Sequence, residues 1–80
     1  MAQVQSLPQF SDRVRFNWGF HDGTRDKQDN RVRDMDSHYD RAYADGYVRG
    51  VLDFHNTGQR SATSDAAWDN YTTLHGPHQG

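Results

Sequence analysis

The sequence contains no cysteine, no glutamate and no isoleucine. Without cysteine, neither a disulfide framework nor a thiolate metal site can form. The apolar runs are only a few residues long, so we expect no membrane-spanning helix. Residues 1–10 lack the charged and apolar segments of a secretory signal. We therefore expect a cytoplasmic protein, acting either in its own cell or in the cytoplasm of a host.

Apolar residues are scarce, at 32% of an 80-residue chain, and the formal net charge is only −2. A chain of this length forms one small domain, whose core supplies about 3–5 kcal/mol of net stability. Two Trp, four Phe and four Tyr carry most of the surface that can be buried. Assembly into a homodimer, or a bound partner, is therefore an expected addition to the stability of the fold.

An aromatic–glycine pattern occurs twice, first as FNWGFHDG and again 27 positions later as YADGYVRG. Each glycine inside a helix costs about 1 kcal/mol relative to alanine, so four of them need a compensating interaction. We predict that the glycines allow two helix backbones to pack closely, either within one chain or between two copies. The expected helix-contact residues are Phe16, Gly19, Phe20, Gly23, Tyr43, Gly46, Tyr47 and Gly50.

The capping residues and the spacing of the aromatic residues predict an all-α fold, in which a two-helix hairpin is followed by a short third helix. Residues 11–75 should form a single small helical domain. Residues 1–10 have no periodic pattern and are expected to be a flexible arm. Residues 76–80 are expected to be a disordered tail.

The first helix should span about residues 12–26, because Ser11 is a suitable capping residue. Gly23 lies either inside this helix or at its C-terminal end as a left-handed cap. The following segment is almost wholly polar, and we expect the helix to fray between about residues 24 and 30 and to give way to a connector.

The second helix should span about residues 37–56, because Ser37 and Asp40 resemble a capping box. Gly58 is placed just beyond its end, as in many helices. A short third helix is expected over about residues 65–74. Four residues of alternating charge step by four along the second helix and should face water. These are Arg41, Asp45, Arg49 and Asp53.

Catalytic and metal-binding functions find little support in the sequence. The grouping of His38 with Asp36 and Asp40 could supply metal ligands, but its spacing matches no known zinc or calcium loop, and a solvated connector is the preferred interpretation. Neither glycine segment matches a phosphate-binding or dinucleotide-binding loop. We therefore expect no enzyme activity, no metal site and no cofactor.

Two kinds of macromolecular partner remain. Arginines cluster in the first half of the chain and could contact RNA, although aspartates are interleaved with them. They are Arg13, Arg15, Arg25, Arg31 and Arg33. Aromatic residues left uncovered by so small a scaffold favour a protein partner instead. The expected partner-binding residues are Trp18, Tyr39, Arg41, Arg49 and Trp68.

The segments GFHDG (19–23) and GYVRG (46–50), separated by a polar connector, resemble those of ribosome modulation factor, a short two-helix protein that binds ribosomes. That family is strongly basic, whereas this chain is slightly acidic. The size and composition also resemble those of small early proteins of tailed phages, which implies inhibition of a host complex. The predicted function is a non-enzymatic module that modulates or inhibits a macromolecular complex by protein–protein contact, and the alternative is a ribosome- or RNA-binding modulator.

Overall fold

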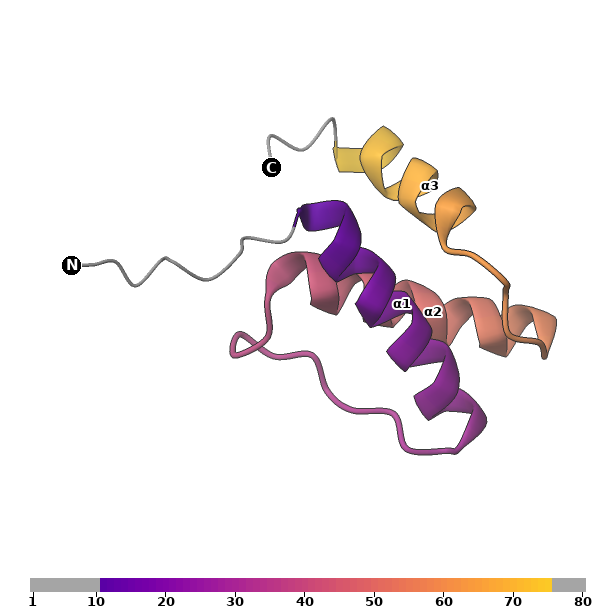
Figure 1. Ribbon diagram of the computed structural model, residues 1–80. Coiled ribbons are helices and arrows are strands. Elements are labelled where there is room, and N and C mark those ends of the chain that lie inside the picture. Colours follow the sequence, from indigo (N-terminus) through magenta and orange to yellow (C-terminus); the bar gives the residue numbers. More distant parts are fainter. Residues whose placement is uncertain (1–10, 76–80) are drawn as a thin grey trace.

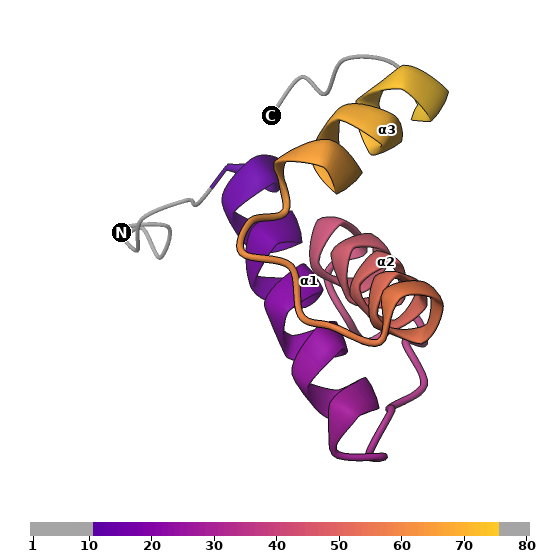
Figure 2. The same ribbon diagram turned by 90° about the vertical axis from the view of Figure 1, so that its right-hand side faces the viewer.

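The computed structural model describes residues 11–75, and it contains the helices α1 (Asp12–Gln28), α2 (Arg41–Thr57) and α3 (Asp65–His75). No strand occurs within these residues, so the predicted all-α fold is confirmed. Helices α1 and α2 cross each other, and α3 lies near the N-terminal end of α1 (Figures 1 and 2). None of the three is long and apolar enough to cross a membrane. The expected arm and tail lie outside the described residues.

Helix α1 begins where the sequence predicts and ends slightly later. The Ser11 hydroxyl accepts a hydrogen bond from the Val14 amide at 3.2 Å, so the predicted cap is confirmed. The helix continues through Gly23 to Gln28, which excludes Gly23 as a C-terminal cap. Basic side chains in the last turn favour this extension, because they interact with the negative end of the helix dipole.

Helix α2 begins at Arg41 rather than near residue 37, so this predicted boundary was wrong. The cap is Asp40, whose carboxylate accepts a hydrogen bond from the Tyr43 amide at 3.1 Å. The preceding residues form a turn in which the Asp36 carboxylate accepts from the His38 amide at 2.9 Å, and this turn holds the chain out of the helix. At the other end, Gly58 has a left-handed φ of 73°, as expected of a C-cap.

The backbones of α1 and α2 meet at the repeated glycines. A Cβ atom on Gly19 would lie 2.8 Å from both the Tyr43 carbonyl carbon and the Tyr47 nitrogen. A Cβ atom on Gly46 would lie 2.8 Å from the Phe16 carbonyl carbon. Real Cβ atoms essentially never come within 3.0 Å of such atoms, so only glycine fits. The predicted close helix contact is confirmed, and it lies within one chain.

The same contact is repeated one helical turn further along both helices. Gly23 lies against the Tyr47 carbonyl group, and Gly50 lies against the Phe20 carbonyl group. Because the contacts advance together, α1 and α2 run in the same general direction, and the connector returns the chain to the start of α2 (Figure 1). Each glycine faces an aromatic residue's carbonyl in the other repeat, so weak Cα–H···O contacts add to the packing.

Different parts of the chain pack against the two sides of the α1–α2 crossing. On one flank, Phe16 is fully buried, and its ring centroid lies 5.2 Å from that of Trp68 and 5.1 Å from that of Tyr71, both on α3. On the other flank, the rings of Tyr43 and Tyr47 stack and carry hydroxyl groups that bond to polar partners. The repeat thus places phenylalanine under an aromatic helix and tyrosine under a polar connector.

Candidate functional site

The five residues expected to bind a partner do not form one surface. The Trp18 side chain is 46% exposed on the outer face of α1. Trp68 is half-buried and packs against the buried aromatic core. Tyr39 lies in the connector and stacks on the next tyrosine of the chain. Arg41 and Arg49 lie on α2, the first exposed and the second half-buried. The structure therefore distributes these residues over four parts of the chain, namely α1, the connector, α2 and α3.

A polar network attaches the connector to the tyrosine flank. The Tyr47 hydroxyl donates to the Asp26 carboxylate at 2.7 Å and accepts from the Arg33 backbone amide at 2.9 Å. Asp26 is only 8% exposed and also accepts from Arg33 Nε at 3.2 Å. Arg33 donates to the Tyr43 hydroxyl, which in turn donates to the Asp22 carboxylate at 2.5 Å. These bonds link α1, the connector and α2 into one unit.

The charges of this network suit a structural role. Burial would raise the pKa of Asp26, but the Tyr47 hydrogen bond and the charges of Arg33 and Arg25 outweigh burial and lower this pKa below its usual value. Burial, followed by the neighbouring carboxylate, raises the pKa of Tyr43 to about 12. Asp26 therefore stays ionised and Tyr43 stays neutral near pH 7, so neither is poised for proton transfer there.

We expect the domain to lose stability as the pH rises from about 10 to about 12. The pKa of a tyrosine in the unfolded chain is about 10, whereas the pKa of Tyr43 in the folded chain is about 12. Between these values the unfolded chain binds fewer protons, so the free energy of unfolding falls as the pH rises. Urea unfolding at a series of pH values should show a shallower decline for Tyr43→Phe than for the natural chain. Equal declines would contradict this account.

A shallow apolar groove of about 230 Å³ lies between the connector and the outer face of α2. Its apolar lining residues are Val32, Met35, Val48, Val51 and Leu52, with Tyr47 at its base. Three of them, Val32, Val48 and Leu52, are 46–49% exposed. We refer to these five aliphatic and methionine residues as the α2 groove. Half-exposed apolar side chains grouped in this way are typical of protein-binding surfaces.

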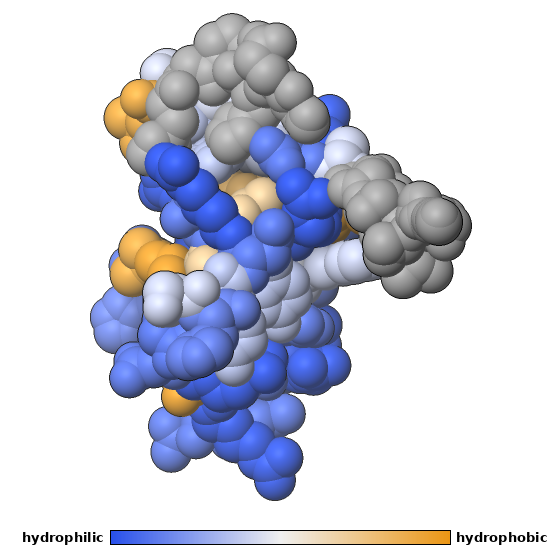
Figure 3. Space-filling view, turned by 90° about the vertical axis from the view of Figure 1, so that its left-hand side faces the viewer, coloured by the Kyte–Doolittle hydropathy of each residue, from blue (hydrophilic) through white to orange (hydrophobic). Residues whose placement is uncertain are grey.

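The α2 groove was not predicted from the sequence, although part of its signal was present. Val48 and Leu52 are four positions apart, so they share one face of a helix. Val32 and Met35 join them only because the connector folds back along α2. Figure 3 shows one face of the molecule, on which apolar areas are small and are separated by polar side chains.

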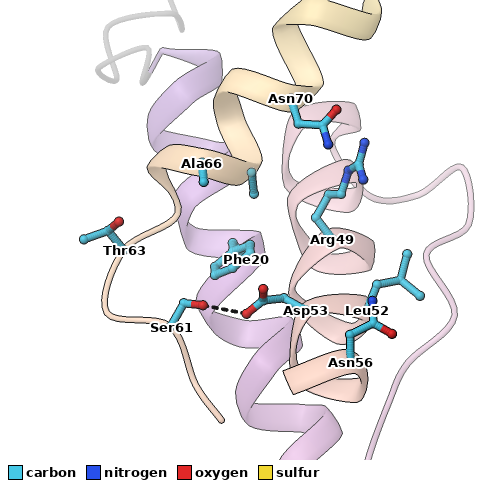
Figure 4. Close-up of a pocket in the computed structure, with 10 residues that line it drawn as sticks. Phe20, Arg49, Leu52, Asp53, Asn56, Ser61, Thr63, Ala66 and Asn70 are labelled. Atoms are coloured by element: carbon cyan, nitrogen blue, oxygen red, sulfur yellow. Dashed lines mark hydrogen bonds between the residues drawn. The ribbon is translucent and has the colours of Figure 1, made fainter. Parts of the chain in front are cut away.

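A second hollow, of about 270 Å³, lies between α2, α3 and the loop that joins them (Figure 4). Phe20 lies at its centre, and Arg49 and Asn70 lie on its α2 and α3 sides. The Ser61 hydroxyl donates to the Asp53 carboxylate at 2.6 Å across its lower part. Asp53 is thus half-buried and bonded within the chain, which corrects the expectation that the whole charge ladder of α2 faces water.

Most of the arginines considered for RNA contact are paired with aspartates of the same chain. The ion pairs are Arg13–Asp65, Arg15–Asp12, Arg15–Asp40, Arg25–Asp22, Arg25–Asp26 and Arg33–Asp26. These pairs compensate most of the local positive charge. In the part of the chain that the structure describes, no three His or Asp side chains are placed to hold a metal ion. The Nδ1 atom of His38 lies 3.2 Å from the Asp36 carboxylate.

Comparisons of the chain with protein-family models, with curated proteins and with solved structures found no match. The resemblance to ribosome modulation factor and to small phage proteins therefore stays a prediction. Among the described residues, the α2 groove brings together three apolar side chains, Val32, Val48 and Leu52, that are each about half exposed.

Proposed function

We propose that the protein is a non-enzymatic binding module, which docks on a protein component of a larger complex through the α2 groove and so modulates or inhibits that complex. It would act in the cytoplasm of its own cell or of a host. The observation that carries this proposal is the grouping of Val32, Val48 and Leu52, each about half exposed. Covering the exposed half of such a side chain contributes about 1 kcal/mol to binding.

The α2 groove is well suited to binding because its walls are already fixed. The connector that carries Val32 and Met35 is tied to α1 and α2 by Arg33, which bonds to Asp26 and Tyr43. The Arg33 guanidinium also lies 5.4 Å from the Tyr47 ring centroid, in a cation–π contact. A preformed surface loses less conformational entropy on binding than a mobile one.

We expect Leu52→Asp to abolish capture of the protein partner, because it places a charge in the centre of the contact, where its desolvation is not compensated. The measurement is affinity capture from lysate, followed by quantification of the captured proteins. Leu74→Asp is the matched control, since Leu74 is 64% exposed on α3, away from the α2 groove. Equal capture by the natural chain and Leu52→Asp would contradict the proposal.

The alternative function, binding to ribosomes or RNA, is distinguished by two further measurements. Contacts with phosphates would make the affinity fall steeply with salt and would weaken it in Arg13→Ala and Arg31→Ala. Apolar docking in the α2 groove would be almost independent of salt. A set of captured partners that disappears after nuclease treatment would favour the alternative and contradict docking through the groove.

A further inference from the structure

We propose that the hollow between α2 and α3 binds a free α-amino acid with an apolar side chain, whose carboxylate pairs with Arg49 and whose ammonium group pairs with Asp53. Among the residues that the structure describes, this hollow and the α2 groove share only Leu52 in their linings, so such binding is separate from partner docking. Two opposite charges, the apolar surface between them and the size of the hollow support the assignment.

Arg49 brings a half-buried positive charge to the hollow. Figure 4 shows its guanidinium group at the same end of the hollow as Asn70 of α3. Within residues 11–75, Arg49 makes no ion pair and no hydrogen bond. Partial burial of a charge is costly unless a partner compensates for the lost water, and the planar donor fork of arginine suits a carboxylate. A carboxylate on the ligand would supply this partner.

Asp53 brings the opposite charge to the other end of the hollow. Its carboxylate accepts a hydrogen bond from the Ser61 hydroxyl at 2.6 Å, which holds it toward the loop (Figure 4). A carboxylate has about four lone-pair sites, so an ammonium group can still donate to it. Arg49 and Asp53 are four positions apart, yet in the described part of the chain they do not pair with each other. The space between them is therefore complementary in charge to a zwitterion.

Apolar surface lies between the two charges. Phe20, which is only 2% exposed, lies at the centre of the hollow (Figure 4). Three more apolar residues line it, namely Leu52, Ala66 and Ala67. An apolar side chain on the ligand would be removed from water against these residues. The volume of about 270 Å³ is just below the about 300–1,000 Å³ of pockets for drug-sized ligands, which suits a single amino acid.

Three related ligands test the two charges separately. L-Leucine carries both charges, N-acetyl-L-leucine lacks the ammonium group, and L-leucinamide lacks the carboxylate. The measurement is a titration of the isotope-labelled natural chain, followed by two-dimensional NMR of its amide and Arg49 Nε signals. We expect L-leucine to cause saturable shifts at the hollow. Each analogue should bind at least about tenfold more weakly, because each loses one hydrogen bond between charged groups.

Two conservative variants assign each charge to its residue. The preference for L-leucine over L-leucinamide should disappear in Arg49→Gln. The preference over N-acetyl-L-leucine should disappear in Asp53→Asn, which keeps an oxygen acceptor for Ser61. Arg31→Gln is the matched control, because it removes the same charge as Arg49→Gln from an exposed position in the connector, and it should bind L-leucine like the natural chain. Circular dichroism confirms that each variant is folded.

A further variant tests the hollow without changing a charge. Ala66→Leu places a larger side chain in the hollow and should abolish the shifts caused by L-leucine. Equal binding of all three ligands to the natural chain would overturn the proposal, as would unchanged ligand preferences in Arg49→Gln. The absence of any saturable shift at about 10 mM L-leucine, where a site with a dissociation constant of about 1 mM would be about nine-tenths filled, would also overturn it.

Discussion

Alanine at both Gly46 and Gly50 should leave the chain unfolded at room temperature. The new Cβ atoms would overlap backbone atoms of Phe16 and Phe20, which cannot move unless the helices separate. Separation exposes the buried aromatic rings to water. The stabilising free energy lost in this way exceeds the net stability of about 3–5 kcal/mol that a core of this size supplies. Helix propensity alone would instead stabilise the chain by about 1 kcal/mol for each substitution. The sign of the change in the free energy of unfolding therefore distinguishes an effect of close helix packing from an effect of helix propensity.

Circular dichroism with urea unfolding measures this effect, and Gly58→Ala is the control. A Cβ atom on Gly58 meets no atom within 4 Å, but its φ of 73° disfavours alanine. This control should therefore lose only about 1–2 kcal/mol, through backbone strain alone, and should remain folded. A cooperative transition in the Gly46→Ala and Gly50→Ala double variant at or above the natural midpoint would refute the close contact.

Asp26→Ala should destabilise the domain by about 2–3 kcal/mol, the second largest effect we expect. The substitution leaves the buried Tyr47 hydroxyl without its acceptor and removes the carboxylate that pairs with Arg33. Arg33 is partly exposed, and water compensates part of the loss at that end. Asp26→Asn keeps an oxygen acceptor for the Tyr47 hydroxyl, so it should lose less than Asp26→Ala.

The same carboxylate makes a stabilising contribution that depends on acidity. Because the pKa of Asp26 is lowered in the folded chain, this contribution is present above about pH 4 and is lost as the pH falls through the folded value. Urea unfolding at neutral and acid pH should show the largest gap between the natural chain and Asp26→Asn at neutral pH. An equal difference in stability between the two chains at neutral and at acid pH would contradict a stabilising role for the Asp26 charge.

The helix contact could be predicted from the sequence because its signal is local. Four glycines at costly positions, each near an aromatic residue, indicate close packing before any fold is known. The direction of the helices could not be predicted in this way, because the spacing within each repeat is the same for either direction. The start of α2 was misplaced because Ser37 and Asp40 are both good capping residues, and the turn at Asp36 decides between them.

The candidate binding surface was less predictable than the fold. Exposed aromatic residues were expected to bind the partner, but Trp68 packs against Phe16 in the core, and Tyr39 stacks on the tyrosine flank. The α2 groove joins Val48 to Val32 of the connector, residues brought together by the returning path of the chain. That path depends on bonds made by Arg33, which no local pattern reveals.

Nuclear Overhauser contacts between the backbones of α1 and α2 would detect the glycine-mediated crossing in solution. We predict contacts from the Gly46 Hα protons to the Phe16 Hα proton, because a Cβ atom on Gly46 would lie only 3.0 Å from the Phe16 Cα. We also predict contacts from the Gly23 Hα protons to the Tyr47 Hα proton, since a Cβ atom on Gly23 would lie 3.1 Å from the Tyr47 Cα. A fully assigned spectrum of the folded chain that lacks both sets of contacts would contradict the glycine-mediated crossing.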